Sequence, residues 1–272
     1  MMQFLHRQFL RIILPMIFIG AAGGYFSFWL PYRDEQLVAL EVEKLRGIAD
    51  FDEFDPAPSL TPYLGRQAIF DRVSRIQLRD KKVTEELLAR IGRLRQLEIL
   101  DLYNTPVTDH GIQLLSGLNQ LQILHLEFTE ITDDGLAVLE SKTSLQVLHL
   151  DKTAITDRGL KHLSKFSNLR VLHLNGTAIS DAGLEHLVGL KNLQWLSLDN
   201  TQLTDQGLLN LKEMKHLHEL DLECTRVTLE GVKGLKEMRS LESLALFGTA
   251  IFRNGRFELR KLMPNCRIQP IP

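Results

Sequence analysis

Large apolar residues recur along this chain with a period of 24 residues. Seven units begin at a leucine, namely Leu97, Leu121, Leu145, Leu169, Leu193, Leu217 and Leu241. A weaker unit precedes them from Val73, with Lys81 and Leu87 in place of the usual threonine and glycine. The eight units fill residues 73–264 without an insertion and loosely follow the phrase LxxLxLxxTxITDxGLxxLxxLxx. A fixed period of this size is typical of a solenoid, in which each unit stacks on its neighbours.

Two hydrophobic periods alternate within each unit. In LxxLxL the last two leucines alternate with polar residues, which predicts a short strand with one buried face. In TDxGLxxLxxL the apolar spacing becomes three, which predicts a helix. One unit cannot bury its leucines alone, so the units are expected to stack at ~4.8 Å along a parallel sheet. The sequence therefore predicts an α/β solenoid of strand–turn–helix coils.

Over residues 73–264 the chain resembles leucine-rich-repeat proteins, and the repeated phrase carries that resemblance. The 24-residue period and the phrase TDxGL are similar to bacterial membrane-anchored members and to the cysteine-containing subclass, with threonine at the cysteine position. The closing LMPNCRI is similar to the end cap of such proteins, so residues 265–272 are expected to form a C-terminal cap. The resemblance implies a curved horseshoe that has its parallel sheet on the concave face and helices on the convex face. It also implies binding of proteins or peptides along the concave sheet.

Three near-constant columns of the repeat have structural explanations. One threonine column is predicted to hydrogen-bond backbone groups of neighbouring coils: Thr105, Thr129, Thr153, Thr177, Thr201, Thr225 and Thr249. A second column lies where a helix N-cap belongs, and the residue after it is usually an aspartate that suits the positive end of the helix: Thr108, Thr132, Thr156, Ser180, Thr204 and Thr228. The glycines from Gly111 to Gly255 are expected to permit close packing at each helix start.

Residues 12–30 form a 19-residue run without a charge, IILPMIFIGAAGGYFSFWL. As a helix this run would span ~28 Å, about the hydrocarbon thickness of a bilayer. Arg7 and Arg11 precede it and aromatic residues crowd its far end, which predicts a transmembrane signal-anchor with residues 1–11 in the cytoplasm. The alternative is a signal peptide cleaved near 20–22, which would release a secreted protein. Both interpretations place the repeats outside the cytoplasm.

Gly20 and Gly24 form a GxxxG pattern, which allows two membrane helices to approach closely and suggests a weak homodimer. Residues 31–72 are predicted to be a helical linker and N-terminal cap. Their apolar spacing predicts a helix over 34–46 that stops at Gly47, then an acidic loop broken by prolines, and a short helix over 61–73.

Positions 3, 5 and 7 of each unit share the strand face opposite the core leucines. Position 3 gives an aliphatic stripe that ends in a tryptophan: Ile99, Ile123, Val147, Val171 and Trp195. Position 5 gives a row with three histidines: Asp101, His125, His149, His173 and Ser197. Position 7 gives a mainly acidic row: Tyr103, Glu127, Asp151, Asn175 and Asp199. Apolar residues beside ordered polar ones are typical of a recognition surface. We therefore expect this face to bind a protein or peptide; the alternative is a passive envelope scaffold or spacer.

The histidine row suggests a second hypothesis, a metal site formed by His125, His149, Glu127 and Asp151. Imidazole and carboxylate groups are proper ligands for zinc, iron or copper. The outer two histidines of the row would start ~9.6 Å apart, so two neighbours with one carboxylate fit an ion better than all three. The plain alternative is a ladder of polar groups that share protons. Acidic neighbours in this ladder also predict an interface that protonated histidines would change below pH ~6.5.

Composition argues against several other functions. The chain has 272 residues, 44% of them hydrophobic, and a formal charge of −2 without a concentrated basic run, which argues against nucleic acid as a partner. Cys224 and Cys266 form no metal-ligand spacing and are expected to be free thiols. The motifs GxSxG, HExxH, GxGxxG and the P-loop are absent. A triad of Ser197, His173 and Asp199 can be drawn, but an open sheet supplies no oxyanion hole, so neither an enzyme nor a cofactor is expected.

Overall fold

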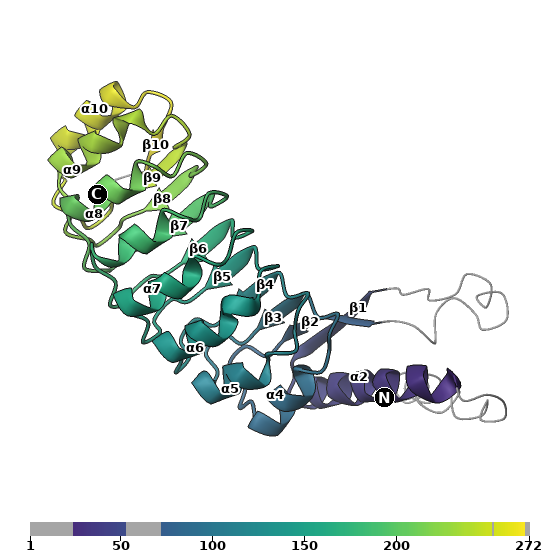
Figure 1. Cartoon of the computed structure of the whole chain (residues 1–272). Helices are drawn as coiled ribbons and strands as arrows, with labels where there is room; N and C mark the ends of the chain where they lie inside the picture. Colours follow the sequence, from purple (N-terminus) through teal and green to yellow (C-terminus); the bar gives the residue numbers. More distant parts are fainter. Residues whose placement is uncertain (1–23, 53–71, 252, 270–272) are drawn as a thin grey trace.

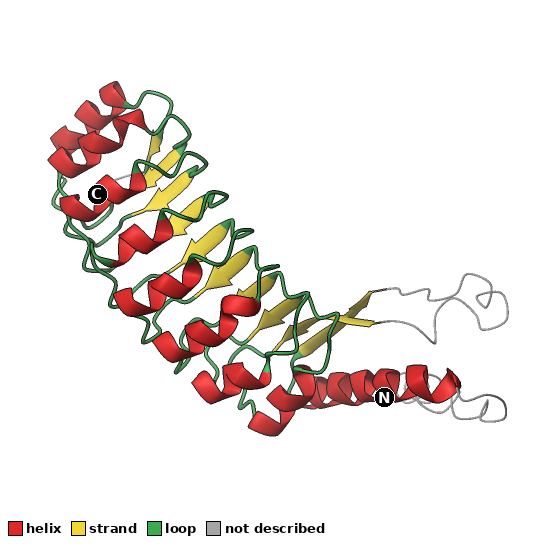
Figure 2. Cartoon of the chain, viewed as in Figure 1, coloured by secondary structure: helices red, strands yellow, loops and turns green. Residues whose placement is uncertain are grey.

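The computed structural model describes residues 24–52, 72–251 and 253–269. They form one sheet of ten strands in chain order, with helices stacked along its other side (Figures 1 and 2). The strands are β1 (Ile48–Asp52), β2 (Arg72–Gln77), β3 (Ile99–Asp101), β4 (Ile123–His125), β5 (Val147–His149), β6 (Val171–His173), β7 (Trp195–Ser197), β8 (Glu219–Asp221), β9 (Ser243–Ala245) and β10 (Arg267–Ile268). The helices of the other side are α4 (Glu85–Ile91), α5 (Asp109–Leu114), α6 (Asp133–Val138), η2 (Leu139–Ser141), α7 (Asp157–Leu163), η3 (Gly183–Leu187), α8 (Asp205–Leu211), α9 (Leu229–Lys233), η4 (Gly234–Glu237) and α10 (Arg253–Leu262). The predicted solenoid of strand–turn–helix coils is confirmed.

Strand pairing reproduces the sequence period. From β2 onward each strand pairs in parallel with the next, and paired residues are 24 positions apart, as Ile99 is from Ile123. Strand β10 keeps the same spacing, since Arg267 pairs with Ser243. The segment expected as a C-terminal cap therefore contributes a further strand to the sheet. Equivalent side chains of successive coils lie directly side by side as a result.

Leucines of the repeat fill the space between the sheet and the helices. In one central coil Leu172 and Leu174 come from β6 and the residue after it, Leu184 comes from η3, and all three are fully buried. Burial of a leucine side chain contributes ~1.5–3 kcal/mol. Because the same positions are buried in the other coils, apolar burial joins each coil to its neighbours.

An aspartate at each of five helix starts also ties its coil to the next one. Thr132 donates its backbone N–H to Asp109 Oδ1 at 2.8 Å and its hydroxyl to Asp109 Oδ2 at 2.6 Å. The same pair of bonds joins Asp133 to Thr156, Asp157 to Ser180, Asp181 to Thr204 and Asp205 to Thr228. We call this arrangement the Asp–Thr hook. The sequence explanation, a favourable charge at the positive end of a helix, had missed this link between coils.

The glycine column follows from the Asp–Thr hook. A Cβ atom built on Gly159 would lie 2.4 Å from Asp133 Oδ1, closer than real Cβ contacts. Gly135, which follows Asp133, meets Asp109 of the preceding coil at the same distance. Each of these glycines leaves room for the carboxylate of the preceding hook, so close packing at the helix start has a specific cause.

The structure corrects the role predicted for the first threonine column. Thr153 donates its hydroxyl to Leu150 O at 2.6 Å, three residues back in its own coil, and is buried. The other members make the same bond. These threonines therefore close the turn after each strand, and within the described residues their hydroxyls do not make the expected bonds to neighbouring coils. In the second column Thr108, Thr132, Thr156 and Thr204 cap helices as predicted. Thr228 is an N-cap without a side-chain cap bond, and the prediction is wrong at Ser180, because η3 has Ala182 as its N-cap.

The turn after each strand places one residue in the left-handed region of backbone space. Its φ is positive at Asn104, Phe128, Lys152, Gly176, Asn200, Cys224 and Gly248. From Asn104 to Cys224 the backbone N–H of this residue donates to a carbonyl of the next coil, as Phe128 N does to Asp151 O at 2.9 Å. That bond carries the pairing of coils beyond the end of the strand.

The N-terminal end of the sheet is covered by helix α2 (Gly24–Lys44) and by β1 (Figure 1). Val38 and Val42 of α2 are buried in the core, and Glu41 pairs with Arg90 of α4. The prediction of an acidic loop that begins near residue 50 is wrong over 50–52, because these residues belong to β1, which is antiparallel to β2. Strand β1 pairs backbone groups that the edge of the parallel sheet would otherwise leave open.

The predicted helix over 34–46 is confirmed over 34–44 as part of α2, which is continuous across residues 30 and 31; residues 45 and 46 form a turn. No helix within the described ranges is both long and apolar enough to cross a membrane. Of the predicted span 12–30, residues 12–23 lie outside the described residues, and so does Gly20 of the proposed GxxxG contact. The expected helix over 61–73 likewise falls outside them up to residue 71, and β2 begins at Arg72. The membrane anchor and the homodimer stay predictions.

Candidate functional site

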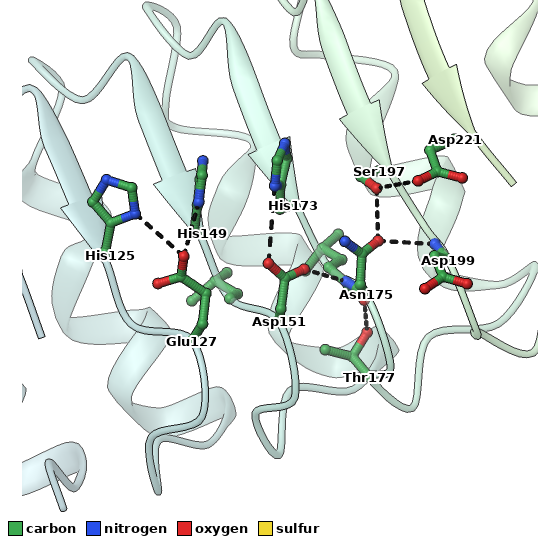
Figure 3. Close-up of polar contacts among 12 residues, drawn as sticks. His125, Glu127, His149, Asp151, His173, Asn175, Thr177, Ser197, Asp199 and Asp221 are labelled. Carbon is green, nitrogen blue, oxygen red and sulfur yellow. Dashed lines mark hydrogen bonds and ion pairs between the residues drawn. The ribbon is translucent and has the colours of Figure 1, made fainter. Parts of the chain in front are cut away.

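Positions 3, 5 and 7 of the coils line the face of the sheet that the helices do not cover. Strand pairing sets His125, His149 and His173 side by side, with Ser197 next along the row. It also sets Val171 beside Trp195. The three predicted rows therefore exist as continuous rows across the sheet, and Figure 3 shows part of the histidine row and of the acidic row.

The three rows differ in exposure more than the sequence suggests. In the aliphatic row, Ile99, Ile123, Val147 and Val171 are half-buried, and Trp195 is exposed over 39% of its surface. In the middle row the histidines are half-buried, while Asp101 and Ser197 are buried. In the third row Glu127 is buried at 6% exposure and Tyr103, Asp151, Asn175 and Asp199 are half-buried. Trp195 is therefore the most exposed side chain of the aliphatic row.

Aromatic rings of the middle row form a continuous column. The ring centroids are 4.4 Å apart for His125 and His149, and 4.1 Å apart for His149 and His173, which stack at 14°. Trp195 continues the column, with its ring 4.9 Å from His173 in an edge-to-face contact. Such pairs contribute ~0.5–1.5 kcal/mol beyond area burial. The column therefore holds Trp195 in a fixed orientation.

Glu127 is the acceptor for two histidines. Its Oε1 atom lies 3.2 Å from Nδ1 of His125, in the same coil, and 3.0 Å from Nδ1 of His149, in the next coil (Figure 3). Burial by itself would raise the pKa of Glu127, but these two hydrogen bonds outweigh it and lower the pKa well below the usual range. Its second oxygen, Oε2, is buried and has no hydrogen-bond partner in the described part of the chain. Glu127 is thus a buried, charged carboxylate with an unused acceptor atom.

The next coil repeats this arrangement with longer distances. His173 Nδ1 lies 3.8 Å from Asp151 Oδ2, too far for a hydrogen bond. Asp151 Oδ1 accepts the backbone N–H of Asn175 at 2.7 Å. Burial, together with the neighbouring His149, lowers the pKa of His173 to about 4, so this imidazole is neutral at physiological pH. Burial raises the pKa of Asp151.

The triad drawn from the sequence does not form. Ser197 Oγ lies 2.7 Å from Asn175 Oδ1 and 3.0 Å from Asp221 Oδ2, and among the described residues it makes no bond to His173. Asn175 Oδ1 also accepts the backbone N–H of Asp199 at 2.9 Å. Ser197 is therefore a buried linker between coils, and it lacks the bonded histidine that an activated nucleophile requires.

Three carboxylates cluster beyond Ser197, and we call Asp199, Asp221 and Glu223 the acidic cluster. Burial and then the charge of Asp221 raise the pKa of Asp199. Burial and the charges of Asp221 and Asp199 raise the pKa of Glu223. Asp199 Oδ1 is buried without a partner among the described residues. Like charges therefore gather around β8 and the end of β7, the strand that begins with the exposed Trp195.

The opposite end of the face has a balanced charge. Arg79 bonds Asp101 at 2.5 Å, and its guanidinium lies 5.1 Å from the ring centroid of Tyr103. Phe128, exposed over 47% of its surface, makes an edge-to-face contact with Tyr103 at 5.4 Å. The sequence reasoning missed Phe128, because it follows position 7 in the turn. Polar residues and glycine are common at this turn position, so a phenylalanine there is the sequence feature that could have identified Phe128.

The sequence comparisons agree with the coil geometry. A leucine-rich-repeat model matches residues 143–203, and a second leucine-rich-repeat model matches residues 118–139 and 213–236. The chain is a leucine-rich-repeat protein. No curated protein matches it.

Two solved structures share its fold. A leucine-rich-repeat protein of Leptospira interrogans is 24% identical, with a TM-score of 0.52 over 67% of this chain. The present chain spans 45% of the length of that protein. Internalin C2 of Listeria monocytogenes is 23% identical, with a TM-score of 0.59 over 82% of this chain and 98% of its own. At these identities the likeness concerns the fold.

Proposed function

We propose that this chain is a non-enzymatic recognition module that binds a protein or peptide on its concave face. The observation that carries the proposal is the exposed Trp195 of β7 on the same sheet face as the acidic cluster, where Trp195 pairs with Glu219 and Ser197 pairs with Asp221. An aromatic side chain held in place by its neighbours contributes contact area with little loss of conformational entropy. Leucine-rich-repeat proteins in general mediate protein–protein interaction, which supports the same conclusion.

The chemistry of the face defines the partner. Trp195 and the half-buried Val171 suit an apolar or aromatic side chain. The acidic cluster suits a lysine or arginine, because a cation would offset the burial and the mutual repulsion that raise the pKa of Asp199 and Glu223. We infer that the partner segment presents an apolar side chain and a basic side chain close together.

Quantitative affinity capture tests this proposal. The full-length chain, solubilised in mild detergent, is incubated with membrane and soluble extracts of its source cells, beside Trp195→Ala and Asp199→Asn/Asp221→Asn variants. Truncation of a hot-spot tryptophan costs ~2 kcal/mol or more, which is about 30-fold in affinity. A protein that both variants lose supports the proposal.

Phe257→Ala is the matched control. Phe257 is an aromatic residue of α10 with 66% exposure, away from the concave face. A partner lost equally in Phe257→Ala, or kept in all variants, contradicts the proposal. If no variant and no wild-type sample captures a protein, the chain acts as an envelope spacer instead.

The proposal includes attachment to a cell membrane through residues 12–30, with the repeats outside the cytoplasm. Its support is the uncharged 19-residue run and the arginines before it. Alkaline extraction of membranes that contain the full chain, beside a chain without residues 12–30, tests it. The full chain should remain in the membrane pellet and the shortened chain should be extracted. Release of the full chain with an intact mass that lacks the first residues would instead indicate a cleaved signal peptide.

A further inference from the structure

His125, Glu127 and His149 are placed so that each offers one ligand atom, and these atoms all lie within 4.8 Å of one another. Two of the three separations are known more closely, 3.2 and 3.0 Å from Glu127 Oε1 to the two Nδ1 atoms. Ligand atoms around a tetrahedral zinc ion are ~3.4 Å apart, given bonds of ~2.0–2.1 Å. Small displacements would therefore open the cluster enough to hold an ion.

Glu127 supplies a second and independent observation. The residue is 6% exposed, and its Oε2 atom is buried without a hydrogen-bond partner in the described structure. Buried polar atoms nearly always have a hydrogen-bond partner or a bound ion, so a buried carboxylate oxygen without a partner beside two imidazoles indicates a site for a cation. A cation bound through Oε2, alone or together with Oε1, would satisfy it.

We propose that His125, Glu127 and His149 form a binding site for a divalent transition-metal ion, of which zinc is the simplest case. Two imidazoles and one carboxylate match the ligand sets of zinc and of non-haem iron sites that keep a position open. The ion takes the place of the proton on each Nδ1 atom, and each neutral imidazole then carries its single proton on Nε2 instead, so both histidines bind the ion through Nδ1 as the other tautomer. Because His149 comes from the next coil, the ion joins two coils.

The neighbouring cluster of His149, Asp151 and His173 is the weaker candidate. Its ligand atoms also lie within 4.8 Å of one another, and it shares His149 with the first cluster. However, His173 Nδ1 is 3.8 Å from Asp151, and Asp151 already accepts the Asn175 backbone N–H. We therefore assign the ion to the cluster that contains Glu127.

Isothermal titration of the metal-stripped full-length protein with ZnCl2 tests the site, with Co²⁺ absorption as a second readout of coordination. Wild type should bind one ion per chain, and Glu127→Gln and His125→Gln should each weaken binding at least 10-fold, since loss of outer-sphere partners alone costs 10–100-fold. Circular dichroism establishes that each variant is folded. Zinc should also raise the thermal midpoint of wild type more than that of either variant.

His162→Gln is the matched control. His162 Nδ1 lies 2.6 Å from Glu140 on the helical side, so it is a histidine–carboxylate pair without a second histidine among its described contacts. This variant should bind zinc like wild type. Equal zinc affinity in wild type, Glu127→Gln and His125→Gln would overturn the site, and so would the absence of saturable zinc or cobalt binding by wild type.

Discussion

Replacement of Asp133 by alanine tests whether the Asp–Thr hook holds the coils together. Asp133 accepts the Thr156 backbone N–H at 2.8 Å and the Thr156 hydroxyl at 2.7 Å. Hydrogen bonds to charged groups contribute ~1.5–3 kcal/mol each. The hook is only half-buried, so we expect Asp133→Ala to lower the free energy of unfolding by about 2–4 kcal/mol.

The residue next to it provides the control. Asp134 stands at the start of the same helix, but it is exposed and its carboxylate makes no hydrogen bond within the described residues. Both variants lose the interaction of a carboxylate with the helix dipole, ~0.3–1 kcal/mol. Asp134→Ala should therefore lose at most about 1 kcal/mol.

Urea unfolding followed by far-ultraviolet circular dichroism measures both variants. The slope of the free energy against urea should stay the same, because neither substitution alters the surface exposed on unfolding. Equal losses of stability in the two variants would refute the reasoning, since the hook would then contribute nothing beyond the dipole.

Other consequences can be checked in the same way. Gly159→Ala should destabilise the chain by about 1–3 kcal/mol, because its Cβ would meet Asp133, whereas Gly189→Ala has nothing within 4 Å and should be neutral by the same urea measurement. Leu172→Ala, at a fully buried site, should cost ~2.7–5 kcal/mol. The lowered pKa of His173 means that the unfolded chain binds more protons as pH falls from 6.5 to about 4. The stability that neutral His173 contributes is fully present above pH 6.5 and is lost as the pH falls from 6.5 to about 4. The loss is at most ~3 kcal/mol, and it is smaller to the extent that solvent reaches the ring. A His173→Gln variant with an unchanged pH profile of stability would contradict this cause.

The sequence was sufficient for the period, the strand faces and the rows they carry, because strict repetition fixes register. Once Ile123 pairs with Ile99, the same spacing of 24 residues pairs the equivalent residues of the other coils. The bonds between coils were less visible, since an aspartate after a threonine reads first as a helix-start charge. Only the folded coil shows that Asp133 reaches Thr156, 23 positions away.

The chemistry within the rows also required coordinates. Spacing shows that Glu127 lies near histidines, but not that one oxygen serves both His125 and His149 while the other is buried without a partner. Side-chain orientation and curvature of the sheet decide those details. The same holds for Phe128, whose backbone conformation follows from the turn and not from its own preference.

The constant spacing of the hooks limits how this chain can change in length. Each hook spans 23 residues and each strand contact spans 24, so one inserted residue within a coil would displace both at once. Removal of a complete coil, such as residues 145–168, would bring Thr132 and Asp133 into line with Ser180 and leave a hook of the same type. The molecule can therefore lengthen or shorten by whole coils, and a gene that gains or loses 72 base pairs in frame can alter the reach of the concave face without a new fold.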